Sequence, residues 1–151
     1  MGVDEIRKAF LFAKKAHAGQ VDKAGKAYIL HPLTVAAKLQ SPEEKVLALL
    51  HDVVEDTDVT LEDVKKEFGE TIASSLDCLT HRGDETYDQY IRRISKNPLA
   101  PRVKLADLNH NMELTRLLQI TEKDRARFEK YSRAYQTLLE AICTDTPREP
   151  V

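Results

Sequence analysis

Apolar residues along this chain recur at offsets of three and four positions, which is the spacing of one face of an α-helix. Ile6, Phe10 and Ala13 follow this spacing and predict a first helix over about 4–18. Capping residues, glycines and prolines mark the boundaries of the later segments. Further helices are predicted to begin at about 31 and to cover about 43–56, 60–68, 70–80, 87–94, 100–118 and 122–142. The sequence therefore predicts one compact all-α domain of about eight helices over 1–143, followed by a flexible C-terminal tail over 144–151.

Composition narrows the classes of protein to which the chain could belong. The 42% of hydrophobic residues is too high for a disordered chain, and the 23 basic residues are balanced by 25 acidic ones. This balance lacks the basic excess that is typical of nucleic-acid binding, and no apolar run approaches the roughly 20 residues of a membrane span. The N-terminus has no apolar signal core, and Cys78 and Cys143 have no metal-type spacing. We expect a cytoplasmic protein without a nucleic-acid or membrane partner, and the sequence leaves its oligomeric state open.

Polar residues interrupt the apolar helix predicted over 43–56. His51 and Asp52, together with Glu55 and Asp56 one turn later, would share one arc of this helix, opposite valines and leucines. Three carboxylates crowded on one arc repel one another unless a positive charge lies among them, and a divalent cation supplies that charge. A solvated acidic face is the alternative interpretation of this helix taken alone.

Two further segments favour the metal interpretation. In the helix predicted over 100–118, Asp107 shares a face with Lys104, His110 and Asn111, and His31 lies at a junction between a loop and a helix. Two imidazoles and two carboxylates form a mixed nitrogen and oxygen ligand set that suits Mn²⁺, Fe²⁺ or Zn²⁺ and leaves positions for water. The sequence leaves two roles open for Lys104, a phosphate contact or a salt bridge, and two for His110, a partner of a metal ligand or a ligand of a second metal.

Four blocks of the sequence resemble the HD-domain phosphohydrolase superfamily and, more narrowly, the hydrolase domain of the RelA/SpoT family and the small stand-alone alarmone hydrolases. They are AHAGQVDKAGKAYILHP (16–32), LLHDVVEDT (49–57), FGETIASSLDCLT (68–80) and VKLADLNHNM (103–112). The resemblance implies a metal-dependent enzyme that removes the 3′-pyrophosphate of guanosine tetra- or pentaphosphate, a small nucleotide substrate. It implies one divalent metal ion, usually Mn²⁺, with Fe²⁺ or Zn²⁺ as alternatives. The implied metal ligands are His31, His51, Asp52 and Asp107; the implied catalytic pair is Glu55 and Asp56; and the implied substrate-binding residues are Lys23 near the phosphates and Asn111 near the ribose.

Asp22 departs from the pattern of these hydrolases, and Ala27, where proline is frequent, is a smaller departure. Their loop before the His-Pro motif commonly carries two adjacent basic residues, whereas this chain has Asp22 followed by Lys23. An acidic residue removes a guanidinium surface and repels a polyphosphate. The sequence therefore leaves open a phosphatase or pyrophosphatase that acts on another nucleotide or a pyrophosphorylated metabolite, and a nucleotide sensor without turnover.

Overall fold

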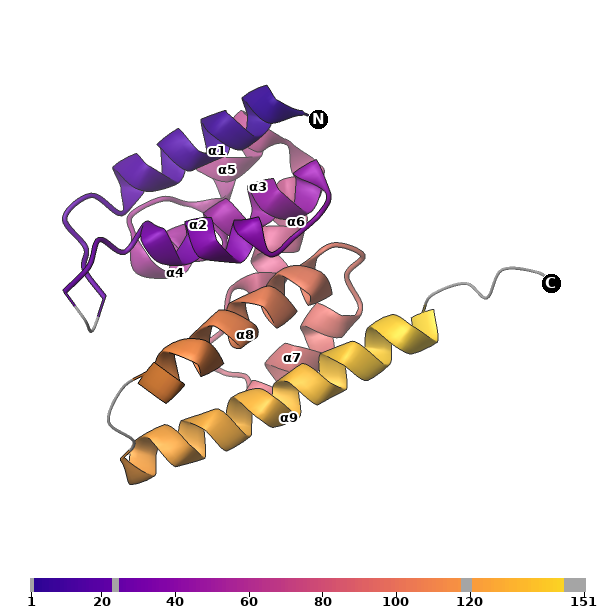
Figure 1. Ribbon diagram of the computed structural model, residues 1–151. Helices are drawn as coiled ribbons and strands as arrows, with labels where there is room; N and C mark the ends of the chain where they lie inside the picture. The colour runs from indigo at the N-terminus through magenta and orange to yellow at the C-terminus, as the bar shows by residue number, and fades with distance from the viewer. Residues whose placement is uncertain (1, 23–24, 118–120, 146–151) are drawn as a thin grey trace.

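The computed structural model describes residues 2–22, 25–117 and 121–145, and the fold in these ranges is all-α, as the periodicity predicts. Two extended residues, Val21 and Ala27, form an isolated antiparallel bridge. The helices, drawn in Figure 1, are α1 (Val3–Ala16), α2 (Leu30–Ala37), α3 (Pro42–Leu50), α4 (Val53–Asp56), α5 (Leu61–Phe68), α6 (Glu70–Leu79), α7 (Tyr87–Ser95), α8 (Ala100–Leu117) and α9 (Glu122–Asp145).

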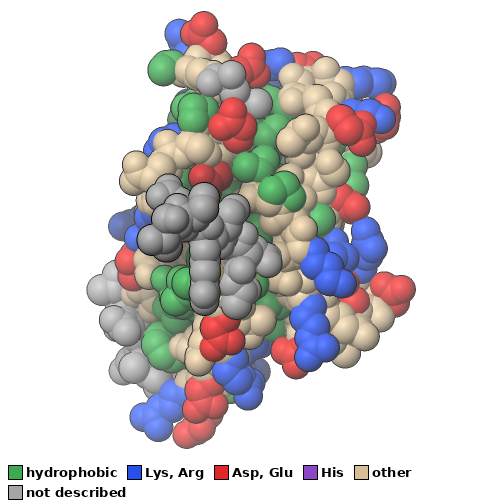
Figure 2. Space-filling model, turned by 90° about the vertical axis from the view of Figure 1, so that its right-hand side faces the viewer, with side chains coloured by type: hydrophobic (Ala, Val, Ile, Leu, Met, Phe, Trp, Pro, Cys, Tyr) green, Lys and Arg blue, Asp and Glu red, His purple; other side chains and the backbone are tan. Residues whose placement is uncertain are grey.

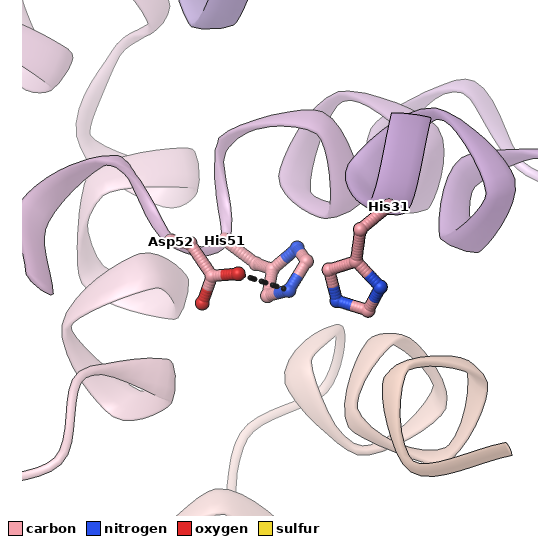
Figure 3. A group of neighbouring side chains, drawn as sticks. All are labelled: His31, His51 and Asp52. Atoms are coloured by element: carbon pink, nitrogen blue, oxygen red, sulfur yellow. Dashed lines mark ion pairs between the residues drawn. The ribbon is translucent and has the colours of Figure 1, made fainter. Parts of the chain in front are cut away.

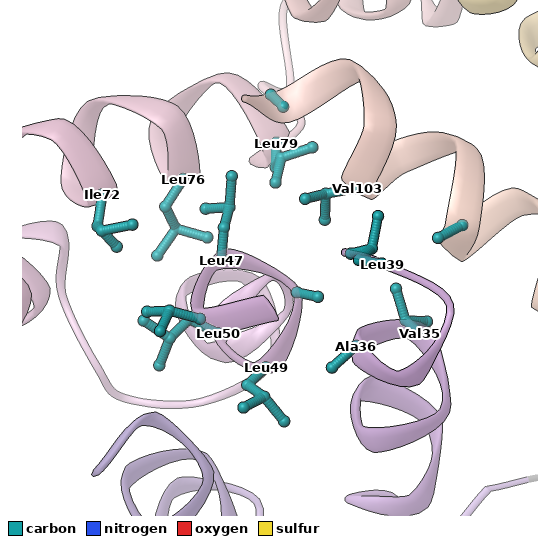
Figure 4. Close-up of a cluster of buried hydrophobic side chains, with 14 of the residues drawn as sticks. Val35, Ala36, Leu39, Leu47, Leu49, Leu50, Ile72, Leu76, Leu79 and Val103 are labelled. Atoms are coloured by element: carbon teal, nitrogen blue, oxygen red, sulfur yellow. The ribbon is translucent and has the colours of Figure 1, made fainter. Parts of the chain in front are cut away.

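Helix α3 lies at the centre of the molecule and contacts α1, α2, α6 and α8. Its position follows from its sequence, because Val46 to Leu50 is an unbroken apolar run and all five residues are buried. A helical segment that is apolar on every side, as this one is, must be covered on every side. Figure 4 shows the result: Leu47 points toward leucines of α6, while Leu49 points to the other side of α3.

The last two helices form the other side of the domain. Helix α8 contacts α2 and α3 on one side and α9 on the other, and α9 also packs along α7 (Figure 1). Helix α9 continues to Asp145, two residues into the expected tail, and 146–151 lie outside the described residues.

Side-chain caps fix where several helices begin. The Ser41 hydroxyl accepts the backbone N–H of Glu44 at the start of α3. Thr60 and Thr86 form capping boxes at the starts of α5 and α7. Gly69, between α5 and α6, has a φ of 91°, which a residue with a side chain rarely adopts. These caps and this glycine mark where one helix ends and the next begins.

The prediction of one continuous helix over 43–56 was wrong. Helix α3 ends at Leu50, His51 and Asp52 form a turn, and α4 begins at Val53. The carbonyl of Ala48 accepts the backbone N–H of His51 at 3.3 Å and its ring Nδ1–H at 2.6 Å. An uninterrupted helix would use this carbonyl for the amide of Asp52. The chain therefore breaks at the two residues that carry the His-Asp pair.

The surface is mixed in charge. Figure 2 shows lysine and arginine side chains interspersed with acidic ones over the face that it draws. Among the described residues, no helix combines the length and the apolar character that crossing a bilayer requires.

Candidate metal centre

Four of the predicted site residues come together from three separate elements. His31 lies in the first turn of α2, His51 and Asp52 form the turn between α3 and α4, and Asp107 lies on α8. His31 Nε2 is 2.9 Å from Asp107 Oδ1, and His51 Nε2 is 3.0 Å from Asp52 Oδ2 and 3.4 Å from Asp107 Oδ1. In Figure 3 the His51 ring lies between the Asp52 carboxylate and the ring of His31. His31, His51 and Asp52 each offer one ligand atom, and these three atoms lie within 4.8 Å of one another.

The donor set fits a divalent metal. The carbonyl of Ala48 can only accept, so His51 carries a proton on Nδ1 and turns Nε2 toward the two carboxylates. This Nε2 is buried and makes no well-aligned hydrogen bond within the described part of the chain. A buried ring nitrogen of this kind, beside a second imidazole and two carboxylates, is suited to a divalent ion such as Zn²⁺, Mn²⁺ or Fe²⁺.

The electrostatics of the cluster are those of tightly packed opposite charges. Burial lowers the pKa of His51, but the neighbouring carboxylates of Asp52 and Asp107 raise it further, so its pKa lies well above the usual value. Burial raises the pKa of Asp52, and His51 outweighs that effect and holds it at about 2. The pKa of Asp107 is also well below its usual range, because Lys104 and His51 outweigh the effect of burial. Both carboxylates therefore remain ionised and available as ligands.

Lys104 makes a salt bridge inside the protein. Its Nζ lies 2.9 Å from Asp107 Oδ2 and 5.3 Å from the centre of the Tyr90 ring. Burial lowers the pKa of this ammonium group, but the charge of Asp107 raises it further, so its pKa is well above the usual value. Of the two roles left open by the sequence, the structure shows the salt bridge.

The two predicted catalytic acids lie on α4 in different surroundings. Glu55 lines a cavity of about 20 Å³ together with His51, Asp52 and Asp107, and its Oε1 accepts the backbone N–H of His81. Partial burial raises the pKa of Glu55. Asp56 is not among the residues that line this cavity, and burial, followed by the charge of Asp52, raises its pKa as well. A carboxyl group with a raised pKa beside a cation site is suited to proton transfer.

The predicted substrate residues are placed only in part. Asn111 lies one turn after Asp107 on α8, and its side-chain Nδ2 donates to Asp107 Oδ1 at 3.2 Å. Lys23 lies outside the described residues. The carboxylate of Asp22 accepts the backbone N–H of Lys26 at 2.9 Å, so this departure from the hydrolase pattern closes the turn of its own loop.

Sequence reasoning missed two polar residues that support the site. The Tyr28 hydroxyl donates a short hydrogen bond to Asp52 Oδ2, and burial, followed by the charge of Asp52, raises the pKa of this phenol. Gln20 donates to the backbone carbonyl of Asp56 at 2.8 Å and contacts His17 Nδ1 at 3.0 Å. Both lie in the segment 16–32, which resembles the hydrolase domain of the RelA/SpoT family. That resemblance is the sequence feature that could have identified them. Periodicity could not identify them, because they lie in loop segments.

A larger cavity of about 350 Å³ lies on the other face of α8. At 100° per residue, Arg102, Leu105 and Asn109 project opposite Asp107 and Asn111. This cavity is therefore separate from the metal cluster, with α8 between them.

The chain is similar to known proteins in sequence and in fold. The sequence model of the HD domain matches residues 9–82. The chain is 35% identical over 133 residues to guanosine-3′,5′-bis(diphosphate) 3′-pyrophosphohydrolase of Aquifex aeolicus, an alignment that covers 82% of this chain and 19% of that protein. It is 36% identical over 125 residues to the bifunctional (p)ppGpp synthase/hydrolase SpoT of Escherichia coli, with coverages of 73% and 18%. The chain thus spans about a fifth of the length of these relatives.

A solved structure shows the same fold. It is described as a metazoan ortholog of SpoT that hydrolyzes ppGpp and plays a role in starvation responses. It superposes with a TM-score of 0.76 at 24% identity and covers 92% of this chain and 87% of that one. Residues 9–82 thus match the HD domain, and the solved structure has the same fold. The proteins similar in sequence include ones named for (p)ppGpp hydrolysis and synthesis.

Proposed function

We propose that the chain is a metal-dependent phosphohydrolase that removes the 3′-pyrophosphate of guanosine 3′,5′-bis(diphosphate) and of the corresponding pentaphosphate. The observation that carries this proposal is the cluster in which His31, His51 and Asp52 each offer a ligand atom within 4.8 Å of one another and Asp107 contacts both imidazoles. Glu55 lines a cavity beside this cluster. The choice of substrate follows from the names of relatives in sequence, which refer to hydrolysis of this nucleotide. The nucleotide is a small molecule, and the proposal includes no nucleic acid.

In this proposal those four residues hold one divalent ion, for which Mn²⁺ is the first candidate. The ion supplies Lewis acidity, which lowers the pKa of water and neutralises charge on phosphoryl oxygens. Tyr28 orients Asp52 through its hydroxyl, and Lys104 and Asn111 hold the two oxygens of Asp107. The ligand oxygens are therefore fixed in place by the protein before a substrate arrives.

The acidic pair on α4 is proposed to activate and orient the attacking water. Hydrolysis requires that water lose a proton as it attacks phosphorus and that the leaving oxygen gain one. Glu55 is the residue proposed for the first task, because it lines the cavity and its carboxylate is already oriented by the backbone of His81. Asp56, which does not line this cavity, is proposed to orient the attacking water from the side open to solvent.

A related nucleotide or a pyrophosphorylated metabolite is the second candidate substrate, and Asp22 is the observation that favours it. The Asp22 carboxylate lies in the loop proposed to face the phosphates, where the hydrolases that the sequence resembles commonly have a basic residue. Its negative charge disfavours a polyphosphate beside this turn.

The test is release of pyrophosphate from a panel of nucleotides that includes guanosine tetraphosphate, measured with Mn²⁺ and with a chelator. We expect Mn²⁺-dependent release from the tetraphosphate, its loss in Asp52→Ala, and a loss of about 10²-fold or more in Glu55→Gln. Glu62→Gln, on the exposed face of α5, is the matched control and should retain wild-type turnover.

Other outcomes would redirect the proposal. Release from a different nucleotide, still abolished in Asp52→Ala, would keep the metal site and replace the substrate. Binding of the tetraphosphate without turnover of any compound would overturn the hydrolase assignment in favour of a sensor.

A further inference from the structure

A histidine outside the predicted ligand set contacts His31. His110 lies on α8, one turn after Asp107, and its Nδ1 is 2.7 Å from Nδ1 of His31. The two rings are nearly parallel, at 18°, yet their centres are 4.9 Å apart. Because the nitrogens are so much closer than the centres, the rings meet edge to edge, as in a hydrogen bond, and do not overlap face to face.

A hydrogen bond between two ring nitrogens requires one proton, and its position decides which tautomer each ring adopts. The other nitrogen of His31, Nε2, is hydrogen-bonded to Asp107 Oδ1 at 2.9 Å, on the side where the carboxylates and His51 converge. A carboxylate can only accept, so an ion bound to Nε2 would take the place of the proton in this hydrogen bond. A ring nitrogen can ligate a metal only through a free lone pair. If Nε2 faces the ion, the proton of neutral His31 must therefore be on Nδ1, and His110 must accept it.

The other imidazole of the cluster shows the same arrangement with a different partner. His51 donates its Nδ1–H to the carbonyl of Ala48 at 2.6 Å, and its Nε2 faces the cluster. A backbone carbonyl enforces this tautomer because it can only accept. At His31, the group that faces Nδ1 is a side chain from α8, His110.

We propose that His110 is a positioning residue that accepts the Nδ1–H of His31 and so turns the Nε2 lone pair of His31 toward the metal ligands. His110 then carries its own proton on Nε2 and is not a ligand. This inference rests on the metal site proposed above, but it concerns ion binding and not turnover.

The experiment compares two amides at position 110, because the side-chain amide of Asn lies near the place of Nδ1 and that of Gln near the place of Nε2. Mn²⁺ and Zn²⁺ affinities of wild type, His110→Asn, His110→Gln and His110→Ala are measured by competition with a chromogenic chelator. We expect His110→Ala and His110→Gln to weaken binding by about 10- to 100-fold, as is typical when the partner of a ligating histidine is removed. His110→Asn should recover most of that loss.

Asn109→Ala, on the opposite face of α8, is the control for the helix and should bind as wild type. A role in packing alone would not distinguish Asn from Gln, so equal affinities for these two variants would overturn the proposal. Wild-type affinity in His110→Ala would also overturn it.

The tautomer gives a second readout that does not require activity. In ¹H–¹⁵N spectra of the Zn²⁺-loaded protein, His31 should carry its proton on Nδ1, and this proton should exchange slowly with water. In His110→Ala, which lacks the acceptor, the same proton should exchange fast. A His31 protonated on Nε2 in the loaded protein would contradict the inference.

Asp52→Ala separates the possible failures. If this variant keeps wild-type affinity, the metal centre itself is wrong, whereas an effect of Asp52→Ala without one of His110→Ala refutes only the role of His110. Normal metal binding without hydrolysis refutes the proposed function and leaves the inference about His110 intact.

Discussion

Lys104 and Asp107 form a buried ion pair beside the candidate metal centre. Lys104 Nζ lies 2.9 Å from Asp107 Oδ2, and both side chains have little solvent exposure. A buried pair adds little net stability, but removing one partner leaves a charge in a poorly solvated place. Lys104 therefore keeps Asp107 ionised and oriented within the cluster.

Replacing this lysine should have an effect that depends on the metal. Lys104→Met retains the length of the side chain and removes the charge, and we expect a loss of about 3 kcal/mol in the free energy of unfolding with chelator present. The loss should be smaller with saturating Mn²⁺, because the ion then compensates Asp107. Urea unfolding under both conditions measures the difference. Lys14→Met, at an exposed position of α1, should change stability by less than about 0.5 kcal/mol in either condition. Equal losses for Lys104→Met with and without metal would contradict this account.

Among individual residues, the sequence identified the candidate metal ligands but not the groups that hold them in place. His51 and Asp52 stand out because they interrupt an apolar helix. Asp107 stands out because it shares a helix face with other polar residues, and His31 because it lies at a junction between a loop and a helix. The structure brings these four residues together. The Ala48 carbonyl and the Tyr28 hydroxyl have no such signal. A backbone acceptor is the same at every residue, and a tyrosine in a loop can point anywhere until the tertiary fold places it.

Among the elements, the loop between α6 and α7 has a role that its charged sequence does not reveal. Arg93 of α7 donates to the backbone carbonyls of Asp77 and Thr80 and pairs with Glu85 at 2.6 Å. These contacts hold the loop against both helices, and the backbone of His81 in this loop binds Glu55. The loop thereby fixes a residue proposed for catalysis.

The Glu85–Arg93 pair predicts how acid affects stability. Hydrogen bonds from Arg93, and then from the backbone of Arg82, lower the pKa of Glu85 from 4.5 to about 2. A carboxyl group whose pKa is lower in the folded state stabilises the fold above its unfolded pKa, and this contribution is lost as the pH falls toward 2. In Glu85→Gln, the free energy of unfolding should therefore fall less steeply between pH 4.5 and 2. Urea unfolding across this range tests it, with Glu62→Gln expected to follow the wild-type slope. A Glu85→Gln curve parallel to wild type would refute the prediction.

The break between α3 and α4 shows where prediction from periodicity stops. The apolar arc of the predicted helix is correct, since Val46, Leu47 and Val53 are buried as expected. The error lies at His51, whose ring competes for the carbonyl of Ala48. Apolar spacing reports which side of a segment faces the core, and it carries no information about a polar side chain that ends the helix from within.

At the scale of the whole molecule, α9 covers one side of the domain and packs along α7 and α8. Neighbouring leucines of this helix have opposite surroundings: Leu138 is fully buried, while Leu139 is 44% exposed. The all-α fold and the approximate position of this helix were predictable from the spacing of apolar residues. Its packing partners were not, because the order of helices along a chain does not determine which of them come into contact.

Paired substitutions test the contribution of α9. Leu138→Ala removes a buried side chain and should lower the free energy of unfolding by about 3 kcal/mol, since a cavity is added to the lost hydrophobic burial. Leu139→Ala should cost less than about 0.5 kcal/mol. Chemical unfolding of both variants measures the contrast, and similar losses would show that α9 does not pack as described.

The distance along the chain between His31 and Asp107 has a consequence for assembly. These residues are 76 positions apart and come from α2 and α8, yet they contact each other. An ion held by both would cross-link half of the chain, and in an unfolded chain the entropy of closing so long a loop keeps the two ends apart. The proposed metal would therefore bind the native state in preference to the unfolded one, and it would stabilise the fold by linking two distant parts of the chain. Its strength would depend on chain topology as well as on ligand chemistry.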